Sequence, residues 1–330
     1  MVAVAQIAVL WAAARQNARA AGVFVCASLL TGCASLAPQT ALLREGLPQG
    51  LPQRVELTAV PFFPQVEYQC GPAALATALA ASGVSATPDD LVSQVYIPER
   101  KGSLQVEMLA AARRQGLVAY QLAPRFEDLL RELAAGTPVI VLQNLGLTDG
   151  WHYAVAVGYD YDRGELILRS GETERQVLSF FVHEFVWQRS NYWAMVAMPP
   201  QRIAVTAEES RWLASVAALE RAGGPRSARI AYRAFLERWP ENVKAAIGLA
   251  NSHHALGELR EAEAVLRDAA RREPDSVIVL NNLAQTLSDQ GRDEEALPLI
   301  ERAAAAGGPF AGAVRQTRQA ILERISRTKR

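Results

Sequence analysis

The chain has 330 residues, of which 50% are hydrophobic, and 34 basic side chains balance 34 acidic ones. This balance gives no bulk electrostatic attraction to nucleic acid, so we expect no nucleic-acid partner. The length exceeds that of most single domains and predicts at least two folded units.

Residues 1–33 have the pattern of an export signal. They contain no acidic side chain, carry Arg15 and Arg19, and continue into an apolar run over 20–30 that ends in Leu-Thr-Gly-Cys at Cys33. A charged flank, a short apolar stretch and small residues before the cut define a secretory signal, and the run is too short for a membrane span. The final residues resemble the cleavage box of bacterial lipoproteins. This resemblance implies that residues 1–32 are removed and that Cys33 carries a lipid.

A lipid on Cys33 would hold the protein at the bacterial cell envelope, facing the periplasm. The alternative is that the apolar segment stays attached as an anchor. Residues 33–54 contain several Pro, Gly and Gln residues with little periodicity, so we expect a tether. With Cys33 acylated, Cys70 is an unpaired thiol in an oxidising compartment, which argues that it is kept for chemistry.

Cys70 stands at the predicted start of an apolar helix. Gly71 and Pro72 mark the beginning of that helix, which is expected to continue through Ala81. A sulfur at this place faces free N–H groups and the positive end of the helix dipole, which favour the thiolate that attacks carbonyl carbons. The alternative interpretation is a buried structural cysteine.

A thiolate that attacks an amide needs a base, a donor to the oxyanion and a group that orients the base. His152 begins a predicted buried strand that runs to Tyr159, and among the four histidines it is the natural base. Gln65, five residues before Cys70, has an amide that can donate to the oxyanion together with the backbone N–H of Cys70. Gln69 is the competing donor.

The sequence leaves the orienting group open. A turn-rich stretch after Asp160 predicts a hairpin whose returning strand covers 165–169 and brings residues 170–172 opposite His152. Ser170 can accept a weak hydrogen bond from the imidazole there. Glu172 would accept a better one if the strand end bends inward.

Two blocks of residues carry a resemblance to a known family. Gln65 with Cys-Gly-Pro-Ala-Ala-Leu at 70–75, and His-Tyr-Ala-Val-Ala-Val-Gly-Tyr-Asp at 152–160, resemble papain-like cysteine peptidases of the bacteriocin-processing, double-glycine leader type, especially their stand-alone relatives. The resemblance covers about residues 60–200. It implies hydrolysis of peptide bonds without a cofactor.

Carried over residue by residue, the resemblance implies Cys70 as nucleophile, His152 as general base and then acid, and Gln65 as oxyanion donor. The chain departs from the family at two points. The interval between Gln65 and Cys70 is one residue shorter than the commoner interval, and Ser170 stands where relatives usually carry an acidic or amide residue.

The pattern of elements predicts the fold of residues 55–200. Helices are expected over 72–82, 88–94, 104–115 and 126–135, and strands over 138–143, 152–159, 165–169 and 193–198. Helices followed by antiparallel strands indicate an α+β domain, which is also what the resemblance to papain-like peptidases implies. The nucleophile then lies on a helix and the base on a sheet across a cleft.

Residues 207–327 contain an internal repeat. Glycines recur every 34 residues at Gly223, Gly257 and Gly291, and alanines and prolines recur at the same interval. This period resembles tetratricopeptide repeats, so we expect an all-α solenoid of three units, the first degraded, followed by a terminal helix. The solenoid is expected to hold a polypeptide substrate or a partner protein; the alternative is that it only caps the first domain. No metal site is expected, because His253 and His254 point to different sides of a helix.

These features lead to two functional hypotheses. The first is a cell-envelope lipoprotein that hydrolyses peptide bonds through a dyad or triad containing Cys70 and His152. Acyl transfer by the same groups is its closest enzymatic variant. The second is a lipid-anchored module that binds peptides in the same cleft without cutting them.

Overall fold

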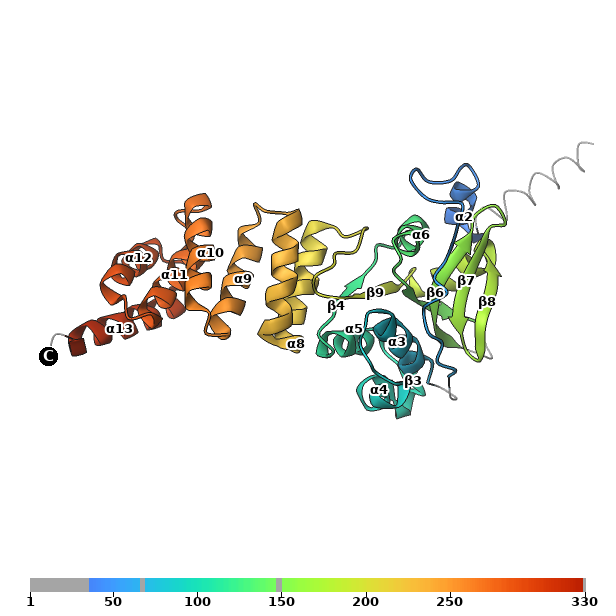
Figure 1. Ribbon diagram of the computed structural model, residues 1–330, viewed down its shortest axis with the longest axis horizontal. Helices are drawn as coiled ribbons and strands as arrows, with labels where there is room; N and C mark the ends of the chain where they lie inside the picture. Colours follow the sequence, from blue (N-terminus) through green and yellow to red (C-terminus); the bar gives the residue numbers. More distant parts are fainter. Residues whose placement is uncertain (1–35, 66–68, 147–149, 329–330) are drawn as a thin grey trace, which may run out of the picture.

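The computed structural model describes residues 36–65, 69–146 and 150–328. Its first part is an α+β domain with the elements α2 (Pro38–Leu43), β1 (Arg54–Glu56), α3 (Cys70–Ala81), α4 (Pro88–Val95), β2 (Tyr96–Ile97), β3 (Gly102–Ser103), α5 (Gln105–Arg114), β4 (Val118–Gln121), α6 (Phe126–Ala134), β5 (Val139–Asn144), β6 (Trp151–Asp160), β7 (Glu165–Ser170), β8 (Thr173–Ser179), α7 (Phe180–Trp187) and β9 (Ala194–Met198). The second part contains α8 (Glu209–Arg238), α9 (Val243–Ala255), α10 (Leu259–Arg272), α11 (Val277–Asp289), α12 (Asp293–Ala306) and α13 (Ala311–Thr328). The two parts follow one another along the long axis of the molecule (Figure 1). The predicted fold class is confirmed.

The centre of the α+β domain is an antiparallel seven-stranded sheet. Its strands lie in the order β4-β9-β5-β6-β7-β8, and β1 pairs with the second half of β6. Asp160 pairs with Glu165, so β6 and β7 form the predicted hairpin. Near the start of β6, His152 lies opposite Gln143 of β5.

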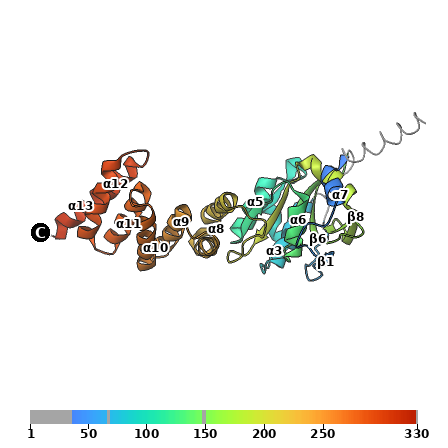
Figure 2. The same ribbon diagram turned by 90° about the horizontal axis from the view of Figure 1, so that it is seen from above.

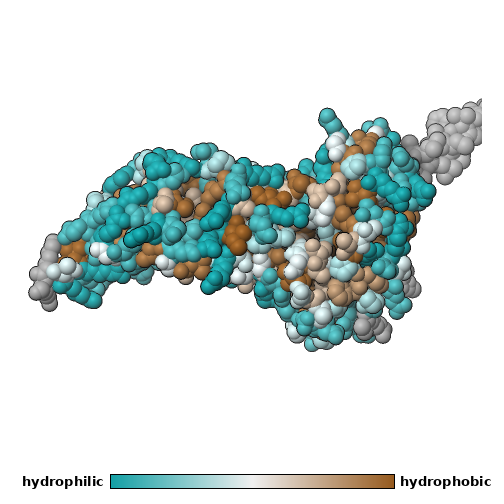
Figure 3. All heavy atoms as spheres, viewed as in Figure 1, coloured by the Kyte–Doolittle hydropathy of each residue, from teal (hydrophilic) through white to brown (hydrophobic). Residues whose placement is uncertain are grey.

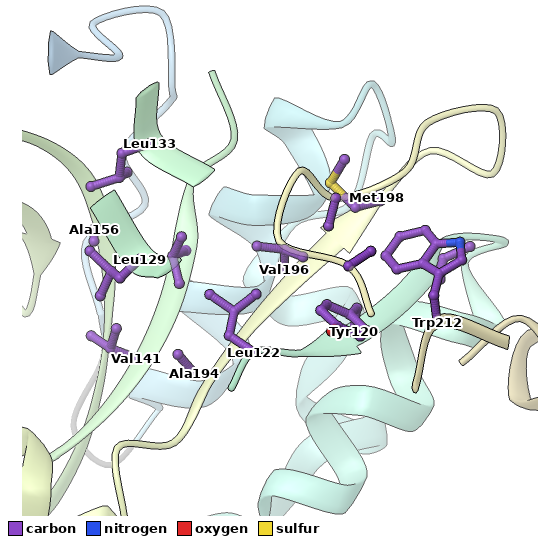
Figure 4. Packing of buried hydrophobic residues seen from close by; sticks show 14 of the residues in the cluster. Tyr120, Leu122, Leu129, Leu133, Val141, Ala156, Ala194, Val196, Met198 and Trp212 are labelled. Carbon is purple, nitrogen blue, oxygen red and sulfur yellow. The ribbon is translucent and has the colours of Figure 1, made fainter. Parts of the chain in front are cut away.

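Side chains alternate between the two faces of the sheet, and each face has its own hydrophobic cluster. Val155 and Ile167 pack on the face covered by α3, together with Leu75 and Leu79 of that helix. The opposite face packs against α6, from which Leu129 and Leu133 are labelled in Figure 4, and against α7. α3 is alanine-rich, which favours the helix and lets it lie close to the sheet. Its first residue is thereby held at one end of the strands, beside the start of the interior strand β6.

The second part begins with a helix pair. α8 breaks at Gly224, whose φ of 81° lies outside the helical region, and Pro225 begins its second half. α9 with α10 and α11 with α12 form two further pairs, and α13 ends the series (Figure 2). This arrangement matches the three predicted units and the terminal helix.

The two parts share one hydrophobic core. The rings of Trp212 in α8 and Tyr120 in β4 lie with their centroids 5.1 Å apart (Figure 4), and the cluster continues from the sheet to Phe235 and Leu249. The buried carboxylate of Glu132 accepts hydrogen bonds from the backbone N–H and the hydroxyl of the connecting residue Thr206, at 2.8 and 2.7 Å. The helical part is therefore packed against the sheet domain.

The N-terminal segment differs from the expected tether. Of residues 33–54, those from 36 onward are described; Leu43 and Leu51 belong to the core of the α+β domain, and α2 packs against α7. The signal peptide over 1–32 and Cys33 lie outside the described residues. In the part of the chain that the structure describes, no helix combines the length and apolar character needed to cross a membrane.

Candidate active site

A groove with a volume of about 940 Å³ brings together the predicted catalytic residues. Its walls come from the start of α3, the β2–β3 hairpin, the ends of β5 and β6 that face each other, and the turn between β7 and β8. Cys70, His152, Gln65 and Ser170 all line it. Residues separated by up to 105 positions in the sequence, Gln65 to Ser170, thus meet at one surface.

Cys70 is the first residue of α3 and a free thiol, and only 7% of its surface is exposed. Burial raises the pKa of the Cys70 thiol, while hydrogen bonds from the backbone N–H groups of Tyr153, Gly71 and Cys70 itself lower it; the net direction is upward. The predicted amide groups are therefore present at the sulfur. They lower the pKa of the thiol as predicted, and the burial that outweighs them comes from residues distant in the sequence.

His152 and Ser170 are joined by a hydrogen bond of 2.9 Å between Nε2 of the ring and Oγ of the hydroxyl. His152 is 8% exposed, and its place near the start of β6 points its ring toward the end of β7. Ser170 thus occupies the orienting position, whereas Glu172 is an exposed residue of the groove wall. A hydroxyl both donates and accepts, so Ser170 holds the ring without selecting one tautomer, as an acceptor-only carboxylate would.

Gln65 lies beside Ser170 and Cys70. Its backbone N–H donates to the carbonyl of Gly171 at 3.2 Å, which fixes it against the β7–β8 turn, and it lines a second small cavity together with Cys70. Gln69, the competing donor, is the N-cap residue of α3, where its carbonyl accepts from the N–H of Ala73. Of the two glutamines, Gln65 is the one that lines the groove.

One wall of the site, formed by β3, was not predicted from the sequence. Ser103 of β3 packs so closely on Gly71 that a Cβ added to Gly71 would lie 2.2 Å from its hydroxyl oxygen. The Ser103 carbonyl also accepts a hydrogen bond of 3.2 Å from the Tyr153 hydroxyl. The glycine after Cys70 was the only local signal of this approach, because glycine is used where another chain comes close.

The other histidines lie away from the groove. His183 is fully buried, its Nδ1 is 3.0 Å from Nε2 of Gln143, and burial lowers its pKa to about 3. His253 Nδ1 lies 2.7 Å from a Glu258 carboxylate oxygen, and His254 Nε2 lies 2.9 Å from an Asp289 carboxylate oxygen.

The model described as the Peptidase_C39 like family matches residues 57–190, and the model of the tetratricopeptide repeat matches residues 213–276 and 250–311. The chain carries a C39-like peptidase domain followed by tetratricopeptide repeats. No curated protein sequence matches it.

Solved structures resemble each part of the chain. A putative C39-like peptidase from Bacillus anthracis is 16% identical with a TM-score of 0.38, and covers 44% of this chain and 98% of its own. The peptidase domain of Streptococcus ComA, a bifunctional ABC transporter involved in a quorum-sensing pathway, is 19% identical with a TM-score of 0.36, and covers 42% and 98%.

On the side of the repeats, the Yersinia enterocolitica type III secretion chaperone SycD, in complex with a peptide of the translocator YopD, is 17% identical with a TM-score of 0.34. It covers 37% of this chain and 94% of its own.

Proposed function

We propose that the protein is a lipid-anchored cysteine peptidase of the bacterial cell envelope, with helical repeats that bind its polypeptide substrate or a partner protein. The observation that carries this proposal is the 2.9 Å contact between His152 and Ser170 in a groove that Cys70 and Gln65 also line. Nucleophile, base, orienting group and oxyanion donor are the groups that amide hydrolysis by a thiol requires.

In the first half of the proposed reaction, His152 takes the proton of the Cys70 thiol on Nδ1, since Nε2 is bonded to Ser170. The sulfur forms a bond to the carbonyl carbon of the peptide. The resulting oxyanion accepts hydrogen bonds from the backbone N–H of Cys70 and the side-chain amide of Gln65. The C–N bond then breaks as the imidazolium returns its proton to the leaving amine, which leaves a thioester on Cys70.

In the second half, His152 removes a proton from a water molecule while the water oxygen attacks the thioester carbonyl. The C–S bond breaks, the sulfur recovers the proton from the imidazolium, and a carboxylic acid leaves the groove. Both halves pass through an imidazolium. Ser170 stabilises that cation only as a neutral hydrogen-bond acceptor, so we expect slower turnover than a carboxylate at this place would support.

The proposed anchor is a lipid on Cys33. Its support is the sequence: a flank with Arg15 and Arg19, the apolar run 20–30 and the small residues that precede the cysteine. Such a lipid would keep the C39-like domain at the membrane surface, on the periplasmic side.

The proposed binding surface for a substrate or partner is the series α9–α13. These helices extend from the side of the domain opposite to β7 and β8 (Figures 1 and 2). A polypeptide bound there is held at a distance from Ser170 and the β7–β8 end of the groove. We infer a docking role for the repeats, separate from the recognition of the residues next to the cleaved bond.

A second candidate function has a specific observation in its favour. Burial raises the pKa of the Cys70 thiol, and the orienting residue Ser170 is uncharged, so the site is less activated than a charged triad. A lipid-anchored module that binds peptides in the groove without cutting them is consistent with both facts.

One experiment separates the two functions. The purified protein is incubated with denatured cell-envelope proteins of the host, and new amino termini are labelled and counted by mass spectrometry. A peptidase produces a set of new termini that is absent with Cys70→Ala and with the more closely matched Cys70→Ser. Identical termini from all three proteins, or none from any, would reject the peptidase and favour the binding module.

A further inference from the structure

The segment just after the proposed lipid site is fastened to the C39-like domain. The first backbone N–H groups of α2, those of Gln39 and Thr40, donate to the two carboxylate oxygens of Glu184 at 2.9 and 2.5 Å. Glu184 belongs to α7 and is fully buried. A buried carboxylate at a helix N-terminus satisfies amide groups that otherwise lack partners, so this contact anchors α2 strongly.

Further hydrogen bonds hold the beginning of the same segment. The side chain of Gln39 accepts from the backbone N–H of Phe126 at 2.5 Å and donates to the carbonyl of Pro124 at 3.1 Å. Gln188, next to α7, donates to the carbonyl of Leu36 at 2.7 Å. The chain is therefore fixed to the domain from Leu36 onward.

This attachment limits how far the domain can lie from a lipid on Cys33. Leu36 follows Cys33 by three residues, and a fully extended chain spans at most about 3.6 Å per residue, so the link reaches at most about 11 Å. That reach is shorter than the radius of gyration expected for a domain of this size, about 15 Å. A lipid inserted in the bilayer at Cys33 consequently brings α2 to the membrane surface.

The surface at this point is apolar. Leu36, Leu42 and Val182 are 46%, 63% and 44% exposed, and half-buried Phe181 and Phe185 lie next to Val182 on α7, with their rings 6.4 Å apart. Apolar residues also gather over α2 in the space-filling view (Figure 3). We call these five residues the α2–α7 face.

A cation lies at the edge of this face. The guanidinium of the exposed Arg189 lies 4.6 Å from the ring centroid of Phe185 and donates from one Nη to the carbonyl of Asn144 at 3.1 Å, which leaves its other N–H groups for lipid phosphates. Apolar side chains bordered by arginine are the composition that inserts into the boundary between headgroups and acyl chains.

We propose that the α2–α7 face docks on the phospholipid bilayer, so that the C39-like domain lies on the membrane in a defined orientation. This inference rests on the proposed lipid anchor at Cys33, which supplies the proximity. The α2–α7 face supplies the orientation. Because α2 and α13 lie at opposite ends of the molecule, the repeats then extend away from this contact (Figure 1).

The test uses the full chain, produced in a bacterium that acylates lipoproteins and reconstituted in vesicles of phosphatidylethanolamine and phosphatidylglycerol. In a background with Cys26→Ala and Cys70→Ala, a single cysteine is introduced by Val182→Cys and labelled with an environment-sensitive fluorophore. The matched control is Ile230→Cys, at a β-branched residue that is 40% exposed on α8. Vesicle flotation is measured on the same samples.

Docking predicts that the protein floats with the vesicles. It also predicts that the emission of the fluorophore at position 182 shifts to shorter wavelength and is quenched by spin-labelled lipid, while the emission of the fluorophore at position 230 does neither. A protein that fails to float overturns the lipid anchor and the docking with it. A protein that floats with equal emission at both positions overturns the docking alone. A shift at position 182 that grows with protein concentration in the absence of vesicles would assign the face to a second copy and also overturn the proposal.

Discussion

The replacement of Ser170 by aspartate tests the site most directly, because it changes only the group that holds His152. A neutral hydrogen bond contributes about 0.5–1.5 kcal/mol and one to a charged group about 1.5–3 kcal/mol. The contact between Ser170 Oγ and His152 Nε2 is already 2.9 Å long, so a carboxylate there gains roughly 1.4 kcal/mol in stabilising the imidazolium. Applied to the ion pair between this imidazolium and the Cys70 thiolate, this gain in free energy corresponds to about one unit in the pKa of the thiol.

The expected result is a lower pKa of the Cys70 thiol in Ser170→Asp. The natural thiol starts from a pKa that burial raises, so the midpoint of alkylation moves down toward neutral pH. A thiolate of lower pKa is also a weaker nucleophile, with a Brønsted coefficient of about 0.4–0.5, so the rate at pH 7 rises by about three- to fourfold instead of tenfold. Ser170→Ala removes the hydrogen bond and shifts the midpoint in the opposite direction.

The assay is the rate of iodoacetamide labelling of Cys70 as a function of pH, read by mass spectrometry of the peptide that contains it. It needs no knowledge of the substrate. Glu172→Gln is the control, since it alters a charge on the wall of the same groove without touching His152. An alkylation midpoint that is the same in Ser170→Asp, Ser170→Ala and the natural protein, with thermal stability unchanged, would show that the imidazole does not act on the sulfur.

Three further predictions concern stability. Gly71→Ala places a carbon 2.2 Å from the Ser103 hydroxyl, so we expect the free energy of unfolding, measured in urea titrations, to fall by about 1–3 kcal/mol. Adding Ser103→Gly should restore the stability, and a double variant as unstable as the single one would contradict this contact. Trp212→Ala removes a buried ring shared by the two parts, so the free energy of unfolding should fall by about 3–5 kcal/mol. The two parts should then unfold in separate calorimetric transitions, and an unchanged transition would count against a common core. Burial raises the pKa of Glu263, but hydrogen bonds from neighbouring arginine side chains outweigh it and lower the pKa to about 2 from an ordinary 4.5. Its carboxylate therefore stabilises the fold above pH 4.5 and loses this effect as the pH falls toward 2. Glu263→Gln should reduce the free energy of unfolding by about 1 kcal/mol at pH 7, a modest value because solvent screens the partly exposed arginines. It should also flatten the dependence of stability on acid pH, followed by circular dichroism, and parallel curves for the variant and the natural protein would refute the assignment.

The parts of the fold that local signals encode were predictable. The helix at Cys70 has a Gly-Pro start, the helix at Pro88 has a capping threonine at Thr87, and the apolar strand from His152 is unbroken; each was found within one or two residues of its place. The repeats were visible because the same 34-residue interval separates three glycines. Gly257 and Gly291 have a positive φ in the turns of their helix pairs, whereas in the first pair Gly224, next to the predicted Gly223, has it.

Two of the elements that were not predicted lack such signals. β8 is a polar, mostly exposed edge strand, so it has no hydrophobic alternation to mark it. α2 owes its position to Glu184, a residue 144 positions from Thr40, and no local pattern reports that contact. The segment therefore looked like a tether in the sequence.

The candidate site was predictable in its residue types and less so in its energetics. Cys70, His152 and Gln65 were assigned by motif and line one groove. The choice between Ser170 and Glu172 depended on how the end of β7 turns into β8, where the pairing register shifts between Leu168 and Ser170. The burial of the thiol arises from the whole fold and has no signature in the residues next to it.

The shared core around Trp212 joins the first helices of the repeats, α8 and α9, to the domain that carries the groove. The position of these two helices relative to Cys70 is consequently set when the chain folds. A polypeptide that engages both the repeats and the groove must bridge the distance between them with its own backbone, and one with too few residues between its docked part and the bond to be cut cannot reach the sulfur. Under the proposed function, a substrate that docks on the repeats is therefore selected by its length as well as by the side chains beside the scissile bond.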